Sequence, residues 1–99
     1  MTKNVRLTDR EIDEFLKALA NENRRKILFL FFDGRERSVG EIATTAKLGQ
    51  STVSEHLAIL RRASVLLSRK EGKEVYYKPD RVAIARILQK FSELLMNCC

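Results

Sequence analysis

Residues 50 to 62 carry the side chains best suited to chemistry, because this stretch combines an apolar stripe with a polar, hydrogen-bonding face. Val53, Leu57 and Leu60 recur at the spacing of a surface helix that packs one side on a core. The opposite side offers short polar and charged ends, which can read base edges in a DNA major groove, and the free N–H groups of a first helical turn suit phosphate. We therefore predict a DNA-contacting helix, with a merely solvated face as the alternative.

Basic side chains accumulate just after this helix. Between residues 61 and 78 the sequence holds six Lys or Arg and two Glu, a net charge of +4. This concentration of positive charge suits binding to the phosphate backbone of a nucleic acid. The alternative function is that of an adaptor whose helix face binds a protein, and an adaptor has no need of such a concentration. The helix is expected to read bases and the basic residues to position it. The predicted contacts to double-stranded DNA are Ser38, Gln50, Ser51, Thr52, Ser54, Glu55, His56, Arg61, Arg62, Arg69, Lys70 and Lys73.

Thiols and imidazole offer little other chemistry. His56 is the only histidine, and we assign it no metal role. Cys98 and Cys99 are adjacent, and two such thiolates can chelate a thiophilic centre such as arsenic(III) or be oxidised. The alternative is an idle pair at a frayed chain end, which we favour because a three-thiolate site would need a third sulfur from a partner subunit. No cofactor is predicted.

Catalysis is not predicted from any residue pattern. The sequence has no phosphate-cradling glycine loop, no nucleophile with a base and an orienting group, and no His, Asp and Glu cluster at ligand spacing. Its 99 residues, 44% of them hydrophobic and 32% charged, indicate one globular domain over residues 1–99. The net charge of +6 favours an acidic partner, either nucleic acid or an anionic membrane. Without an apolar run of about 20 residues or a signal-peptide core, we expect a cytoplasmic protein with no membrane partner.

Helix-capping signals mark the first third of the chain. The capping box Thr8-Asp9-Arg10-Glu11 predicts a helix that ends near residue 20. A second helix is predicted over residues 22–33, with Gly34 as its stop. The run Ile27–Phe32 is too apolar for a helix covered on one side only, so we expect this helix to be the most enclosed element.

A helix-turn-helix arrangement follows. A second capping box, Ser38-Val39-Gly40-Glu41, starts a short helix that ends near residue 47. Leu48-Gly49 then forms a tight turn into the helix over residues 50–62. These two helices, joined by a short glycine-containing turn, predict the arrangement that places its second helix in a DNA groove.

Strand composition and a broad apolar helix close the chain. Residues 65–70 and 73–78 predict a β-hairpin around Glu71-Gly72, in which one of the two tyrosines Tyr76-Tyr77 packs inward. Asp80 caps a last helix over residues 81–96. Its apolar stripe is broader than one covered side requires, so we predict a dimer surface; the alternative is that the stripe simply closes the monomer core. The predicted surface comprises Ile84, Ile87, Leu88, Phe91, Leu94 and Leu95.

The order of these elements and four motifs resemble the ArsR/SmtB family of winged-helix repressors. The motifs are Leu16–Asn21 leading into Arg24 and Ile27-Leu28, then Val39–Ala43, Gln50–Leu57 and Arg69–Tyr77. The resemblance implies a mainly α fold with a small β-hairpin, the winged helix-turn-helix. It also implies a homodimer joined through its first and last helices, which adds Ile12 and Phe15 to the predicted interface. Such a dimer would bind a partly palindromic operator and repress transcription until an inducer releases it.

Several positions depart from the family pattern. Many members sense metals through a Cys-x-Cys motif where this chain has Ser38-Val39-Gly40, and others use ligands on the last helix, where Asp80 and Glu93 have no accompanying histidine. Both common metal sites are therefore expected to be absent. Glu55 stands where members often carry His, and it would narrow base preference or bridge to a nearby arginine. Ser64 stands where a glycine usually ends the recognition helix in the left-handed conformation.

Overall fold

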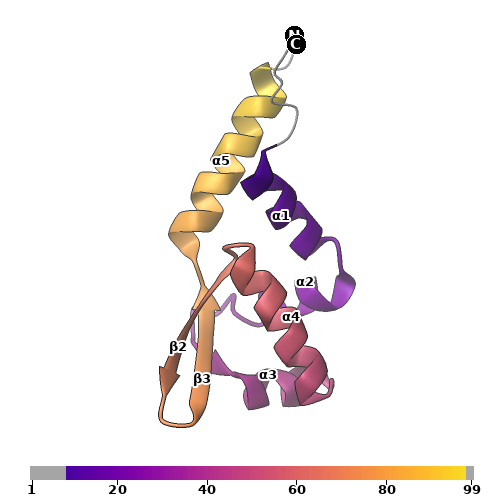
Figure 1. The fold of residues 1–99 in the computed structure, drawn as a ribbon, viewed down its shortest axis with the longest axis vertical. Helices are drawn as coiled ribbons and strands as arrows, with labels where there is room; N and C mark the ends of the chain where they lie inside the picture. The colour runs from indigo at the N-terminus through magenta and orange to yellow at the C-terminus, as the bar shows by residue number, and fades with distance from the viewer. Residues whose placement is uncertain (1–8, 98–99) are drawn as a thin grey trace.

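The structure, a computed structural model, describes residues 9–97 and contains five helices and three strands over that range (Figure 1). The predicted order of elements is confirmed, and a short strand before the third helix is added. The elements in order are α1 (Arg10–Leu19), α2 (Glu22–Phe29), β1 (Arg37–Ser38), α3 (Val39–Ala46), α4 (Gln50–Arg62), β2 (Leu66–Glu71), β3 (Glu74–Pro79) and α5 (Arg81–Asn97).

The start of α1 differs from the predicted capping box. Asp9, not Thr8, is the N-cap residue, and its carboxylate accepts the backbone N–H of Ile12 at 3.1 Å. Thr8 lies outside the described residues. The Glu11 carboxylate accepts instead from Arg86 and Lys90 of α5, so it ties two helices together and does not close a box. The helix start is therefore where the sequence placed it, but the capping residue is Asp9, which is among the preferred N-cap residues.

The second helix is shorter than predicted because its last turn tightens. It ends at Phe29, and the following residues make hydrogen bonds between residues three apart up to Gly34, whose φ is +79°. Ile27 and Phe31, four residues apart, are fully buried, whereas Phe29 and Phe32 are 54% and 73% exposed. The expectation that the whole apolar run is enclosed is therefore wrong, because only one face of it reaches the core.

The sheet is antiparallel with strand order β1-β3-β2. The predicted hairpin is confirmed, and its two-residue loop is Gly72-Lys73, with Gly72 at a φ of +61°. Tyr77 packs against the hydrophobic core, while the ring of Tyr76 lies on the other face of the strand under Arg69. β1 was not predicted because its two residues carry no periodic signal and depend on pairing with β3.

The core is built around α4. Val53, Leu57 and Leu60 are completely buried, as the helical spacing predicted, and they pack with side chains from every other helix. This burial fixes the rotation of α4 about its own axis, so that its polar face is held toward solvent. Deeply buried members of the same core include Ile27, Phe31, Ile42, Val65, Leu66 and Ile87.

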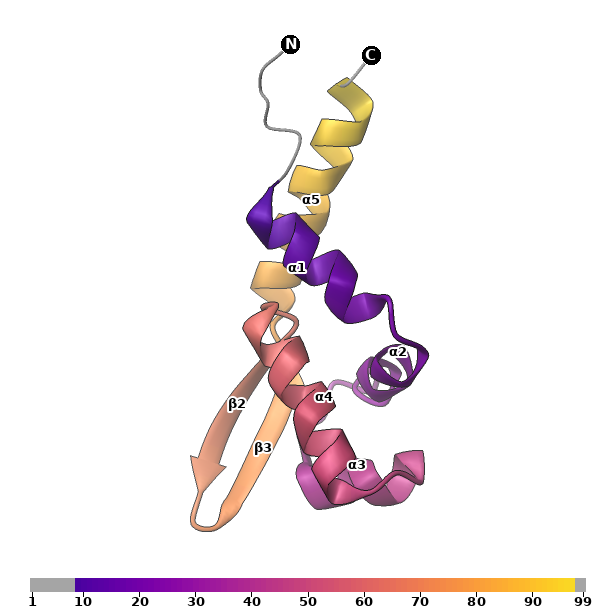
Figure 2. The same cartoon turned by 45° about the vertical axis from the view of Figure 1, so that its right-hand side comes forward.

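The long final helix continues past α1 and away from the hairpin, as both views show (Figures 1 and 2). The apolar stripe of α5 divides between the core and the surface. Ile12, Phe15 and Ile87 are buried within the monomer, which corrects their assignment to a dimer surface, and Ile84 and Phe91 are partly buried against the same core. The reason is that α1 covers the first half of α5. Leu88, Leu94, Leu95 and Met96 are exposed.

Candidate nucleic-acid interface

The polar face of α4 is exposed over its first two turns. Gln50, Ser51, Thr52, Ser54 and Glu55 all have exposed side chains, opposite the buried stripe. Gly49 precedes the helix and supplies no side-chain cap, so N–H groups of the first turn have no side-chain acceptor. Exposed hydrogen-bonding ends beside such N–H groups form a surface that can bind bases and phosphate together.

A tight turn joins α3 to this helix, which confirms the predicted helix-turn-helix. Lys47 ends α3 in the left-handed conformation with a φ of +58°, and the Leu48 N–H bonds the Ala43 carbonyl. The side-chain amide nitrogen of Gln50 lies 3.7 Å from the position that a Cβ on Gly40 would occupy. The first residue of α4 therefore lies close to the first turn of α3.

Ser38 does not share this exposed surface. Its side chain is buried, and its hydroxyl accepts the Glu41 N–H at 3.2 Å while the Glu41 carboxylate accepts the Ser38 N–H at 2.8 Å. The predicted capping box is thus confirmed in full. The same bond explains why the placement of Ser38 among the DNA contacts needs correction, since the hydroxyl is committed to starting α3.

His56 is half-buried and joined to Arg24. The Arg24 Nη1 lies 3.3 Å from His56 Nδ1, and the Arg24 Nε donates to the carbonyl of Ala18 at 2.7 Å. Because a guanidinium can only donate, Nδ1 must accept and the ring proton sits on Nε2. Burial first, and then the Arg24 charge, lower the pKa of His56 below its usual value of 6.5, against an opposing effect of Glu55.

The expected bridge from Glu55 to an arginine is not formed: within residues 9–97 its carboxylate has no hydrogen bond or ion pair. Arg24 contacts His56 instead, because its guanidinium is held at the carbonyl end of α1. Glu55 is therefore left exposed on the outer face of α4 beside Ser54. Sequence reasoning missed the contact of Arg24, since it joins residues 32 positions apart.

A pH titration tests the environment of His56. With its folded-state pKa lowered, the unfolded chain takes up the proton first, so stability is complete above about pH 6.5 and is lost as the pH falls below it. The pKa values of Asp9 and Glu11 are lowered by their hydrogen bonds, so those carboxylates affect stability only below about pH 4.5. Urea unfolding between pH 8 and 5 should show this loss, and His56→Gln should flatten it; equal slopes in both proteins would contradict the assignment.

Some basic side chains near α4 are bound to other residues of the protein, and others are not. Arg61 donates from Nε to the Ser68 hydroxyl at 3.0 Å, and Arg69 is bound to two carboxylates. Lys70 and Lys73 are exposed, and their side chains form no hydrogen bond or ion pair within the described part of the chain. The hairpin tip, α3 and the first turn of α4 lie at the same end of the molecule (Figure 1). The hairpin tip that carries Lys73 therefore lies at the same end of the molecule as the exposed start of α4.

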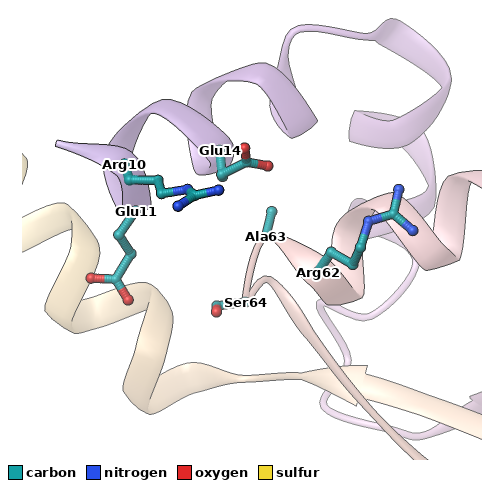
Figure 3. Close-up of a pocket in the computed structure, with 6 residues that line it drawn as sticks. All are labelled: Arg10, Glu11, Glu14, Arg62, Ala63 and Ser64. Atoms are coloured by element: carbon teal, nitrogen blue, oxygen red, sulfur yellow. The ribbon is translucent and has the colours of Figure 1, made fainter. Parts of the chain in front are cut away.

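A hollow of about 600 Å³ separates α1 from the C-terminal end of α4 (Figure 3). Arg10, Glu11 and Glu14 line it from α1, with Arg62, Ala63 and Ser64 on the other side. Arg62 thus borders this hollow as well as standing among the predicted DNA contacts. Two arginines balance two glutamates here, so the hollow favours neither cationic nor anionic ligands.

Ser64 adopts the left-handed conformation that was expected there, with a φ of +66°. For a residue other than glycine this conformation costs about 1–2 kcal/mol. The Ser64 N–H donates to the Arg61 carbonyl, and the Val65 N–H donates to the Leu60 carbonyl. The strained residue therefore ends α4 and turns the chain into the hairpin.

Metal-binding groups are not assembled within residues 9–97, where no three His, Cys, Asp or Glu side chains lie close enough to hold an ion. Cys98 and Cys99, the predicted dithiol, lie outside the described residues. No helix in the described range combines the length and apolar character needed to cross a membrane.

Comparison of the chain with known proteins identifies its family. The model described as "Bacterial regulatory protein, arsR family" matches residues 21–66, which include α3, the turn and α4. The chain is 39% identical over 79 residues to the transcriptional activator HlyU of Vibrio cholerae, covering 80% of this chain and 72% of that protein. It is 38% identical over 65 residues to the arsenical resistance operon repressor of Escherichia coli, covering 66% and 56%.

A solved structure extends the similarity to the whole fold. It is the homodimeric winged helix-turn-helix DNA-binding domain of a possible ArsR-family transcriptional regulator from Mycobacterium bovis, with 29% identity and a TM-score of 0.68. The match covers 90% of this chain and 84% of that one. The fold is thus a winged helix-turn-helix. The chain belongs to the arsR family of bacterial regulatory proteins, which are transcriptional regulators and not enzymes.

Proposed function

We propose that this protein regulates transcription by binding an operator in double-stranded DNA as a homodimer, with α4 of each protomer in a major groove. One observation carries the proposal: a rigid helix exposes Gln50, Ser51, Ser54 and Glu55 at the same end of the molecule as the basic hairpin tip. In this arrangement α4 reads base edges while Lys70 and Lys73 contact phosphate. Acting on operator DNA would place the protein in the cytoplasm, as the sequence suggested.

The shape of the chain supports the homodimer. Its radius of gyration is 15.3 Å, whereas a compact domain of this length has about 13 Å. The excess comes from α5, which extends past α1 and carries exposed Leu88, Leu94, Leu95 and Met96. A second copy packed on this end of α5 would cover these side chains and give the assembly two copies of α4 related by a twofold axis. The neighbour from Mycobacterium bovis is itself homodimeric.

Repression is the direction of control that we propose. A dimer bound across two half-sites within a promoter blocks access of the transcription machinery to that promoter. Repression of this kind needs no contact with another protein, so the DNA-binding and dimer surfaces are sufficient for it. The relative from Escherichia coli is a repressor and the one from Vibrio cholerae an activator, so the position of the operator would decide the outcome. A promoter fusion carrying the operator should be silenced by the protein, and stimulation would overturn this part of the proposal.

Selection from random duplex DNA tests the function directly. We expect enrichment of a partly palindromic sequence whose half-sites lie roughly 10 to 11 base pairs apart, because the two recognition helices of a dimer enter successive major grooves. If the purified dimer enriches no sequence and its weak binding is independent of sequence, the protein-binding adaptor, in which the same helix face meets a protein, replaces this proposal.

We propose, in place of the idle pair favoured from the sequence alone, that the releasing signal acts on Cys98 and Cys99. Support comes from their position, directly after a helix that ends at Asn97 and is proposed to join the subunits, and from the arsenical resistance repressor among the relatives. Arsenite or a thiol oxidant should then lower operator affinity by about 5- to 150-fold, the usual range for coupling between sites. The double variant Cys98→Ser, Cys99→Ser should bind normally and lose the response. An unchanged response in that variant would identify a different signal.

A further inference from the structure

The four basic residues of the hairpin, Arg69, Lys70, Lys73 and Lys78, are not equivalent. Arg69 on β2 makes four hydrogen bonds to carboxylates: its Nε to both oxygens of Glu36 at 3.1 and 3.0 Å, its Nη2 to Glu36 at 2.8 Å and its Nη1 to Glu71 at 2.6 Å. Its guanidinium carbon also lies 4.9 Å from the ring centroid of Tyr76. The side chains of Lys70 and Lys73, beside it, form no hydrogen bond or ion pair within residues 9–97.

These contacts run across the full width of the sheet. Arg69 and Tyr76 are directly opposite in the β2–β3 register, so their side chains share one face, and Tyr76 in turn pairs with Ser38 of β1. Glu36 precedes β1, and the next residue, Arg37, is tied to the Leu30 carbonyl at 2.9 Å and to Asp33. The outer strand of the hairpin is thereby fastened to a segment that is itself anchored to the end of α2.

The charge balance of this cluster disfavours a phosphate ligand. Two cations, Arg69 and Lys78, face the carboxylates of Glu36 and Glu71, so the group as a whole offers a phosphate no net positive charge. Both carboxylates raise the pKa of Arg69, and the arginine lowers the pKa of Glu36, so Arg69 and Glu36 stay charged across the physiological range. To contact DNA, Arg69 would have to give up a bidentate bond whose planar geometry matches the carboxylate.

We propose that Arg69 is a positioning residue, which clamps the hairpin to the helical body through Glu36, and that Lys70 and Lys73 make the phosphate contacts of the hairpin. This inference rests on the proposed binding of DNA. The sequence suggested that Arg69 contacts phosphate. We assign it instead the role of holding the hairpin, and with it Lys70 and Lys73, in position relative to α4.

The dependence of operator binding on salt separates the two roles. Each lost phosphate contact lowers the slope of log affinity against log salt by about 0.9. Because the proposed dimer carries each lysine twice, Lys70→Ala and Lys73→Ala should each reduce the slope by about 1.8. Arg69→Ala should keep the wild-type slope and weaken binding at every salt concentration by about two- to fivefold, the scale of an exposed ion pair. Faster hydrogen exchange in the hairpin amides, with the helices unchanged, should accompany it.

Glu36→Gln provides the matched control, because it breaks the clamp and leaves the arginine in place. It should behave like Arg69→Ala, and the double variant should be no worse than either single one. A slope reduced by about 1.8 in Arg69→Ala, or tighter binding by Glu36→Gln, would show that Arg69 contacts phosphate and would overturn the inference. Absence of salt-dependent duplex binding by the wild-type protein would instead count against the proposed function.

Discussion

Leu88→Glu is expected to convert the protein to a monomer and to weaken operator binding by about 10²- to 10⁴-fold, because linking two binding units multiplies affinity by that range. Leu88 is 48% exposed on α5, next to the partly buried Ile84 and Phe91, so a carboxylate there can stay solvated in the monomer. In the dimer the same charge would be buried without a partner, which is costly. Sedimentation and operator titration on one preparation should show both losses together.

Val82→Glu is the matched control for that experiment. Val82 lies on the same helix and is 77% exposed, but it is at the end of α5 nearest the hairpin. The added charge is identical, so a general effect of negative charge on DNA binding appears equally in both variants. Val82→Glu should remain dimeric and bind DNA almost normally. If Leu88→Glu is monomeric and still binds the operator tightly, α5 is not the surface that couples the two half-sites.

Gln50→Glu should reduce operator affinity by about 1–3 kcal/mol per half-site, or roughly 5- to 150-fold, the range for losing a good base contact. The substitution keeps the shape of the side chain and places a negative charge at the first residue of α4, where DNA phosphates would approach. An acidic residue at a helix N-terminus stabilises the helix by about 0.3–1 kcal/mol. The fold should therefore become slightly more stable while DNA binding falls, and this opposition of signs excludes unfolding as the cause.

Gln89→Glu makes the same chemical change on an exposed position of α5. It lowers the net charge of the protein by the same amount, so any effect of long-range electrostatics on association is matched. Operator binding should stay within about twofold of the wild type, since exposed charges far from the DNA are screened by salt. Equal losses in both glutamine variants would mean that the first turn of α4 does not face the DNA.

Local signals in the sequence predicted much of the fold. The box at Ser38 and Glu41 and the spacing of Val53 and Leu57 are complete within one or two helical turns, so they could be recognised without knowledge of the rest. The hairpin was equally local, because its loop joins adjacent strands. Where two adjacent residues could both cap a helix, as Thr8 and Asp9 could, the helix start was predicted correctly but the capping residue was not, since Asp9 is the N-cap.

Contacts between distant residues were beyond sequence reasoning. No pattern in the segment around Glu36 predicts its hydrogen bonds to Arg69, which is 33 residues away. Likewise, β1 forms only because it pairs with β3. The stripe of α5 shows a different limit. Burial in the monomer and exposure to a partner produce the same helical spacing, so Ile87 and Leu88 looked alike until the structure showed that Ile87 lies on the face of α5 that is buried in the core and Leu88 on an exposed face.

Hydroxyl-radical footprinting of the wild-type protein on its selected duplex tests the central claim most directly. In the proposed complex, α4 enters the major groove twice, once for each protomer. Saturation should therefore occur at two protomers per duplex, with two protected segments roughly 10 to 11 base pairs apart, centre to centre, on one face of the DNA. A single asymmetric protected segment at saturation, occupied by one protomer, would contradict the account.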